Sequence, residues 1–291
     1  SAAAVIRSSV QAASDLNGAE FPATEFVGYS KTDVHTAVVV ARPWAGSRMF
    51  VKLERSPFYA ASGGQVSDHG YVELEDGARL DVADVLKFGD DQVLVVELGS
   101  HAAPAENTRV HAVVNWSERY PTQANHTATH LLHQALRDVL GEHVKQAGSA
   151  VRPDMLRFDF SHDRALTAEE RDRVERLVNE KVFEAIPVRT YVTPIEEARK
   201  LGAMMLFGEK YGDEVRVVEI GGYSTELCGG THVRSTAEIG PFVILGERSV
   251  GSGARRIEAV TAGEAWTVLE GRSKELEAVR AELEQARKEA K

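Results

Sequence analysis

The stretch Asn125-His-Thr-Ala-Thr-His-Leu-Leu-His-Gln-Ala-Leu-Arg137 carries apolar residues at helical spacing. Residues four apart on a helix project from one face, so His126 and His130 present two imidazoles together. Later in the chain, Cys228-Gly-Gly-Thr-His232 repeats this spacing with a thiol and an imidazole, and its two glycines allow a tight turn. One cysteine and three histidines form a ligand set typical of tetrahedral zinc. The two motifs therefore predict a zinc site at His126, His130, Cys228 and His232.

Two other interpretations of these motifs exist. Zincin proteases share the histidine spacing, but their general base is a glutamate directly after the first histidine, where this chain has Thr127. Cys228 can also be read as a buried free thiol beside histidines of the core or the surface. The repeated spacing of suitable ligand types favours zinc over both.

The composition indicates a globular protein with more than one compact part. The chain has 291 residues, 43% of them hydrophobic, and a net charge of -10, which argues against nonspecific adhesion to nucleic acid. A single cysteine excludes an internal disulfide, and neither a signal peptide nor a long apolar run is present. We expect a cytoplasmic protein without a membrane span. Because it starts at Ser1 and stops at Lys291 within a helical pattern, we also expect it to be a piece of a longer protein.

The hydrophobic pattern predicts an α+β protein in four segments. Residues 1–20, rich in Ala and Ser, predict a linker or short helix. Residues 21–115 contain short β-rich runs broken by Gly, Pro and Asp, which is typical of a small antiparallel β-barrel. Residues 116–264 mix helices and strands and predict an α+β core with the zinc site. Residues 265–291 carry apolar residues at steps of three and four, which predicts the start of a helical or coiled-coil arm.

The expected elements follow from local signals. Thr167 and Glu170 form a capping box that opens one helix, and Thr193 and Glu196 are expected to open another. The expected strands are 34–40, 49–53, 71–74, 80–85, 93–98 and 110–114 in the barrel, and 156–160, 215–220, 242–245 and 257–260 in the core.

Six motifs, in order, resemble the editing region of alanyl-tRNA synthetase. They are residues 56–70 (SPFYAASGGQVSDHG), 125–133 (NHTATHLLH), 143–149 (HVKQAGS), 206–213 (LFGEKYGD), 228–233 (CGGTHV) and 253–261 (GARRIEAVT). The resemblance covers residues 21–265, and AlaX trans-editing proteins and the editing domain of threonyl-tRNA synthetase are related. Two positions depart from the family pattern, with Ala61 in place of a glutamate and Ser67 in place of a glycine.

The resemblance implies a function and partners. It implies hydrolysis of tRNA(Ala) wrongly charged with serine or glycine, with zinc as the cofactor. The tail implies self-association in the full-length protein. The family's aminoacylation domain is not expected in this chain, so the chain by itself is not expected to charge tRNA.

The resemblance also implies two catalytic candidates. Gln146 matches a position of the editing pocket, where its amide can bind substrate or orient water; otherwise it is an ordinary polar loop residue. Thr129 can offer its hydroxyl to the serine side chain, although a threonine within a helix is often packed or bonded to its own helix.

A second group of residues is expected to contact substrate or tRNA. Arg255 or Arg256 is expected to bind the terminal adenosine or its phosphate, and a solvated charge pair at the start of a strand is the other interpretation. Gly229 and Gly230 are expected beside the substrate. Gly63-Gly64-Gln65 is expected to line the seam between barrel and core, and a plain β-turn is the alternative.

The chemistry leaves one question open. An aminoacyl-tRNA is an ester, and zinc can polarise its carbonyl or lower the pKa of a bound water, but catalytic zinc usually keeps an open position. Here either one of four ligands is loose, or the site expands, or zinc only orders the pocket. No Gly-x-Ser-x-Gly elbow occurs, so direct attack by water is expected. The alternative function is a zinc-stabilised, noncatalytic module that binds tRNA or a partner.

Overall fold

The computed structural model describes residues 21–290, except residue 45 and residues 206–210. It divides into two compact units, Ser1–Tyr120 and Pro121–Lys291, called here the barrel unit and the α+β unit. The expected linker at 1–20 and most of the motif at 206–213 lie outside the described residues. The four-segment division drawn from the sequence stays a prediction.

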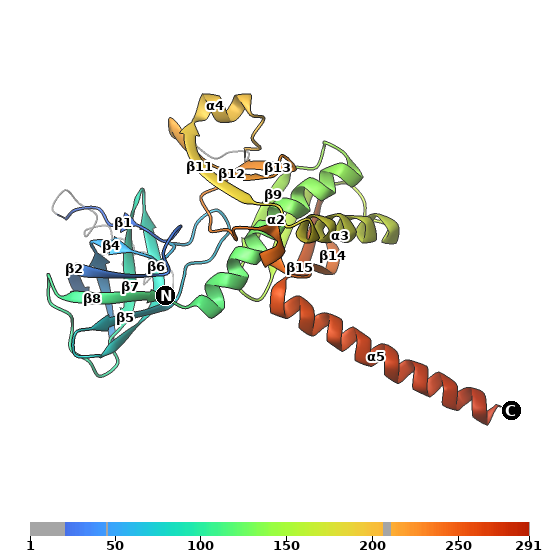
Figure 1. The fold of residues 1–291 in the computed structure, drawn as a ribbon, viewed down its shortest axis with the longest axis horizontal. Helices are drawn as coiled ribbons and strands as arrows, with labels where there is room; N and C mark the ends of the chain where they lie inside the picture. Colours follow the sequence, from blue (N-terminus) through green and yellow to red (C-terminus); the bar gives the residue numbers. More distant parts are fainter. Residues whose placement is uncertain (1–20, 45, 206–210, 291) are drawn as a thin grey trace. The chain divides into compact units, whose positions relative to one another are not determined.

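The barrel unit contains a closed barrel whose paired strands all run antiparallel, in the order β2-β3-β7-β6-β5-β8 (Figure 1). Side chains alternate between its interior and surface, as in β8, where Val110, Ala112 and Val114 are buried. All six barrel strands expected from the sequence are confirmed. Their bounds are β2 Asp33–Pro43, β3 Arg48–Leu53, β5 Gly70–Leu74, β6 Arg79–Phe88, β7 Asp91–Glu97 and β8 Arg109–Val114, and the short strands β1 Glu25–Phe26 and β4 Arg55–Ser56 pair in parallel.

Two ion pairs are buried in the barrel unit. Lys52, with no exposed surface, pairs with Asp91. Arg119 lies in the first turns of helix α2 (Trp116–Leu140), and its Nε donates to Oδ1 of Asp68 at 2.8 Å. Two further N–H groups of Arg119 donate to backbone carbonyls of the unit, each at 2.8 Å. Each buried charge therefore has an opposite charge beside it.

The α+β unit contains two antiparallel sheets, with the strand orders β14-β15-β10-β9 and β11-β12-β13. Helix α2 continues into this unit, where nearly all of its residues from 124 to 136 are buried. The other elements are β9 Gln146–Val151, β10 Leu156–Ser161, α3 Ala168–Phe183, β11 Val188–Pro194, α4 Ile195–Lys200, β12 Glu214–Ile220, β13 Ser224–Leu227, the 3-10 helix η1 Thr236–Ile239, β14 Val243–Gly251, β15 Ala254–Val260 and α5 Ala262–Glu289.

The helix starts test the capping predictions. The capping box at α3 is confirmed, because Thr167 and Glu170 each accept a hydrogen bond from the other's backbone N–H. The predicted cap at Thr193 is wrong, because Thr193 lies in β11 opposite Val215 and α4 starts only after Pro194. The helix begins one residue later than the capping signal predicts, with Pro194 at the N-cap and no side-chain cap hydrogen bond.

The tail is a helix, as expected. Helix α5 spans 28 residues, and Ala265 near its start is its buried residue. Five of its large apolar residues are exposed: Trp266, Leu269, Leu276, Val279 and Leu283. This confirms an α+β fold class with a barrel, a mixed core and a helical tail. Within the described residues, no helix has the length and apolar character needed to cross a membrane.

Candidate metal centre

Helix α2 positions the first two candidate ligands. His126 and His130 are both buried, and their ring centroids lie 5.4 Å apart. The buried helix around them packs through Ala128, Leu131 and Leu132, so the two imidazoles project from a fixed backbone. This half of the centre is set by helix geometry alone.

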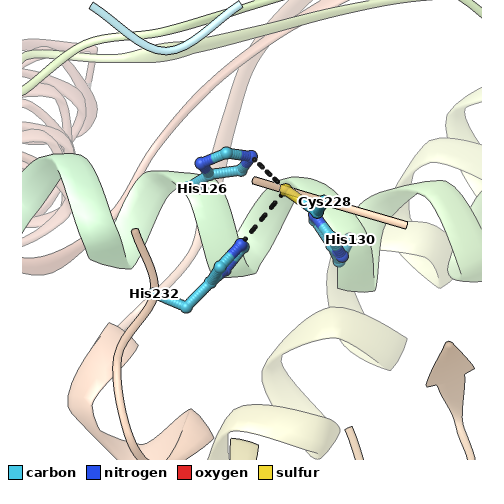
Figure 2. A group of neighbouring side chains, drawn as sticks. All are labelled: His126, His130, Cys228 and His232. Atoms are coloured by element: carbon cyan, nitrogen blue, oxygen red, sulfur yellow. Dashed lines mark hydrogen bonds between the residues drawn. The ribbon is translucent and has the colours of Figure 1, made fainter. Parts of the chain in front are cut away.

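The loop after β13 brings the other two candidate ligands to the same place. Cys228 Sγ lies 3.4 Å from Nε2 of His126 and 3.4 Å from Nε2 of His232 (Figure 2). The ligand atoms of His126, His130, Cys228 and His232 all lie within 4.8 Å of one another. The two helix ligands are buried, whereas the two loop ligands are partly exposed. The four predicted ligands thus form one cluster that is open on the loop side.

Arg216 stabilises this loop through hydrogen bonds to its backbone. Its Nη1 donates to the carbonyl of Cys228 at 2.8 Å and to that of Gly230 at 2.9 Å. The backbone N–H of Gly230 donates to Cys228 Sγ at 3.4 Å. An N–H aimed at sulfur stabilises a thiolate, so the loop supports both the position and the charge of this ligand.

The surroundings of Cys228 and His232 favour the protonation states that a metal requires. Burial raises the pKa of the Cys228 thiol, but His126 and His232 beside it lower that pKa well below its usual range. Burial and the neighbouring His126 lower the pKa of His232 well below its usual value, which keeps that imidazole neutral. Thiolate and neutral imidazole are the forms that bind zinc.

Glu226 is a buried carboxylate beside the cluster. One of its oxygens lies 3.2 Å from Nδ1 of His133, and the other lies 3.7 Å from Nδ1 of His130. Burial lowers the pKa of His130, but the charges of Glu226 and Cys228 outweigh it and raise that pKa to about 9. The sequence analysis did not identify Glu226.

Thr127 is a second residue that the sequence analysis did not assign to the site. Its hydroxyl donates to the carbonyl of Gln123 at 2.9 Å. The same oxygen lies 3.1 Å from Nδ1 of His232 and 3.3 Å from the backbone N–H of Val233. Its partners follow 105 and 106 residues later, so no local pattern marks it.

The two catalytic candidates lie in the same unit. Thr129 is buried on α2 and donates its hydroxyl proton to the carbonyl of Asn125 at 2.8 Å. Gln146 opens β9, is partly exposed, and donates through Nε2 to Ser149 Oγ at 3.3 Å. Their catalytic roles stay predictions.

The two arginines are engaged in ion pairs. Arg256 makes a two-pronged pair with Asp159 at 2.6 and 2.7 Å, and Arg255 pairs through Nε with Glu247. They follow each other on β15 and so point to opposite faces of the sheet. At most one of them can face a given ligand on one side of this sheet, which agrees with a role for Arg255 or Arg256, and that role stays a prediction.

The glycine loop of the barrel unit forms a tight turn. Ser62 and Gln65 exchange backbone hydrogen bonds of 3.1 and 3.0 Å, and Gly63 and Gly64 between them have φ values of 58° and 84°. Positive φ at both central positions is the geometry that favours glycine in a two-residue hairpin turn. This is the plain β-turn that the sequence left as the alternative, and a contact of Gly63, Gly64 or Gln65 with substrate stays a prediction.

The chain is similar to known tRNA synthetases. Residues 215–258 match the family described as the threonyl and alanyl tRNA synthetase second additional domain, and residues 2–118 match the family of class II (A) tRNA synthetases. The chain is 48% identical over 252 residues to an alanine–tRNA ligase of Halalkalibacterium halodurans and 49% identical over 253 residues to one of Oceanobacillus iheyensis. Each alignment covers 84% of this chain.

The chain is similar to one part of alanyl-tRNA synthetases. The resemblance expected from the six motifs is thereby confirmed. The chain spans 29% of the length of the two relatives. The match to the second additional domain contains Cys228, His232 and Glu226. The described part of the class II match is the barrel unit with the start of α2.

Proposed function

We propose that this region of an alanyl-tRNA synthetase hydrolyses tRNA(Ala) that carries serine or glycine. The observation that carries the proposal is the cluster of His126, His130, Cys228 and His232, half of which lies in the second additional domain match. A thiolate and imidazoles gathered beside a partly exposed loop suit hydrolysis assisted by a metal.

We propose zinc as the resident metal, held by the four clustered residues. The donor set fits, because one sulfur and three nitrogens lie within 4.8 Å of one another and the cysteine is poised as a thiolate. Zinc, when bound, supplies a Lewis acid for the ester carbonyl or a more acidic water.

The chain's own residues position the reacting groups. Nε2 of Gln146 donates to Ser149, so its side-chain oxygen is the atom that would accept a hydrogen bond from the attacking water and orient it. The water oxygen bonds to the carbonyl carbon and the bond to the ribose oxygen breaks. The ribose oxygen takes a proton released by the water, which leaves free amino acid and uncharged tRNA(Ala).

Thr129 supports the choice of serine over alanine. Its hydroxyl proton is committed to Asn125, so toward a substrate its oxygen can only accept a hydrogen bond. The serine hydroxyl can donate that bond, whereas the alanine methyl would leave the buried oxygen without it. Glycine offers no such bond, and its selection over alanine has to come from the space available for a methyl group.

Arg255 is the better of the two arginine candidates for tRNA(Ala). Its bond to Glu247 uses Nε, so the terminal nitrogens are the atoms that would meet a phosphate. Arg256 engages both Nε and a terminal nitrogen with Asp159. Gly229, which is exposed, and Gly230, which is buried, are proposed to border the substrate at the metal-binding loop.

The proposal is tested by the hydrolysis of Ser-tRNA(Ala) beside Ala-tRNA(Ala), with wild-type chain and a Cys228→Ala variant in parallel. We expect selective loss of serine, which the variant abolishes. A Gln146→Ala variant is expected to keep its zinc and lose most of the rate. Equal, uncatalysed decay of both esters with zinc-loaded, folded protein would contradict the proposal and favour a noncatalytic tRNA-binding or partner-binding module.

We also propose that α5 pairs with α5 of a second chain. Leu269, Leu276 and Leu283 are exposed and recur at intervals of seven. On either side of this stripe, Glu275 and Glu282 face positions that Arg280 and Arg287 would occupy on a parallel partner. Opposite charges across the seam favour a parallel pair over an antiparallel one.

The measurement is sedimentation velocity over a range of protein concentrations. Leu276→Glu is expected to weaken the pairing strongly, whereas Glu277→Lys, on the adjacent outer position, is the matched control. A wild-type chain that stays monomeric at high concentration contradicts self-association through the described part of the tail.

A further inference from the structure

We propose that Thr127 and Glu226 are positioning residues for the metal centre, each holding one ligand histidine in the form that offers Nε2 to the metal. Thr127 holds His232, and Glu226 holds His130. The proposal rests on the proposed metal site and adds two residues to it. Neither residue is itself a ligand; each lies beside Nδ1 of a ligand histidine, the nitrogen that faces away from the metal.

The Thr127 hydroxyl can only accept a hydrogen bond from His232. A hydroxyl has one proton, and Thr127 donates it to the carbonyl of Gln123 at 2.9 Å. The backbone N–H of Val233 also points at this oxygen, at 3.3 Å. At 3.1 Å from the same oxygen, Nδ1 of His232 therefore carries the proton. The lone pair of His232 is then on Nε2, the nitrogen that lies 3.4 Å from Cys228 Sγ.

Glu226 orients His130 in the same way. An ionised carboxylate only accepts hydrogen bonds, and Glu226 has Nδ1 of His133 at 3.2 Å and Nδ1 of His130 at 3.7 Å. Nδ1 of His130 is buried and forms no hydrogen bond in the described structure, and the Glu226 carboxylate lies 3.7 Å from it. Ser224 Oγ, at 3.3 Å, fixes one carboxylate oxygen. Glu226 thus places the proton of His130 on Nδ1 and turns Nε2 toward the cluster.

The two residues cross-link the halves of the centre. Thr127 lies on α2 and holds a histidine of the loop, whereas Glu226 lies on β13 and holds a histidine of α2. In addition to orienting a ring, the first contact therefore joins helix and loop, and the second joins helix and strand. Contacts of this kind behind metal ligands typically contribute about 10- to 100-fold to metal affinity.

The test is zinc affinity, measured by competition with a chromophoric chelator. Thr127→Val is expected to bind zinc about 10- to 100-fold more weakly. Thr127→Ser, which keeps the hydroxyl, is expected to restore near wild-type affinity. Thr129→Val is the matched control, because that hydroxyl also donates to a carbonyl four residues back on α2 but faces neither His130 nor His232 in any hydrogen bond. Glu226→Gln is expected to weaken binding over the same range.

A second readout separates positioning from general stability. In the zinc-loaded protein, nitrogen NMR of labelled histidines is expected to find the protons of His130 and His232 on Nδ1 and the metal on Nε2. Metal bound through Nδ1 of either ring overturns the proposal for that residue. Folded Thr127→Val and Glu226→Gln variants with unchanged zinc affinity overturn it altogether. If Thr127→Val fails to fold, Glu226→Gln and the NMR assignment decide.

Both readouts are independent of hydrolysis. Failure of the editing assay with intact zinc binding would remove the proposed function and leave these two roles standing. Failure of zinc to bind the wild-type protein at all would overturn the proposed metal site and this inference together.

Discussion

The two units bury charge in different ways. In the barrel unit, Lys52 faces Asp91 and Arg119 faces Asp68, so each buried charge meets one opposite charge. In the α+β unit, the candidate ligand atoms of three histidines and one cysteine lie within 4.8 Å of one another. A matched ion pair needs nothing further, whereas converging electron donors are stable in the interior when a cation joins them. The ion pairs of the barrel unit therefore stabilise the fold, whereas the cluster of the α+β unit is suited to bind a ligand.

The largest loss of stability is expected from removing one partner of a buried ion pair in the barrel unit. Arg119→Ala leaves Asp68 buried without its countercharge and is expected to lower the free energy of unfolding by about 3–5 kcal/mol. Urea denaturation measures the loss. Arg48→Ala is the control, because Arg48 pairs with Glu97 at the surface at 2.7 Å and should cost less than about 1 kcal/mol. Equal losses for the two variants would show that burial is not the deciding factor.

Removal of metal is expected to lower the stability of the α+β unit and not that of the barrel unit. Zinc at 100 times its dissociation constant is expected to stabilise the protein by about 2.7 kcal/mol, an effect that chelation abolishes. Thermal unfolding with and without zinc measures it, with hydrogen exchange to locate it. Protection is expected to fall in the α+β unit and not in the barrel strands. The Cys228→Ala variant should show little zinc dependence, and a stabilisation as large as that of the wild type would place the metal elsewhere.

A surface cap shows what an ordinary polar contact in the α+β unit is worth. Thr167→Ala removes the N-cap of α3 and is expected to lower the free energy of unfolding by about 1 kcal/mol. Thr193→Ala is its matched control, because Thr193 lies in a strand and caps no helix. Denaturant unfolding of the two variants should rank them in that order, and the reverse order would contradict the observed start of α4.

The smallest expected effect is a dependence on acid at the same cap. The bond from Arg164, followed by that from the Thr167 backbone, lowers the pKa of Glu170 to about 2. Because this folded-state pKa lies below the unfolded value of about 4.3, the group stabilises the protein above that pH. The contribution is lost as pH falls toward 2. Thermal unfolding of Glu170→Gln between pH 5 and pH 2 should show a flatter decline than wild type, and parallel curves would contradict it.

The elements that could be predicted are those with strong local patterns. The barrel strands alternate apolar and polar residues, and α3 opens with a complete capping box, so both were predicted. Strand β9, Gln-Ala-Gly-Ser-Ala-Val, has little intrinsic strand preference and exists because it pairs with β10. Thr193 carries a cap signal, yet it pairs with β12 and the helix begins one residue later than that signal predicts. Long-range pairing is the information that a local pattern lacks.

In the candidate site, too, local patterns predict some residues, and long-range contacts determine the others. The spacing of two residues on one helix, or in one short loop, predicts which ligands share a side, and the structure brings those four together. Thr127 and Glu226 were missed because their partners are chosen by the fold: Thr127 meets His232 across 105 residues, and Glu226 meets His133 across 93. Spacing predicts the donors, and the tertiary fold selects the residues that orient them.

The placement of two ligands on a helix and two on a loop has a consequence for exchange kinetics. His126 and His130 can move apart only if a buried turn of α2 unwinds, whereas Cys228 and His232 move when the partly exposed loop opens. Opening of the loop is expected to be the lower-energy motion, so an ion entering the proposed site would first meet the two imidazoles of the helix and then be enclosed. The residence time of that ion would then depend on how firmly Arg216 holds the two loop carbonyls.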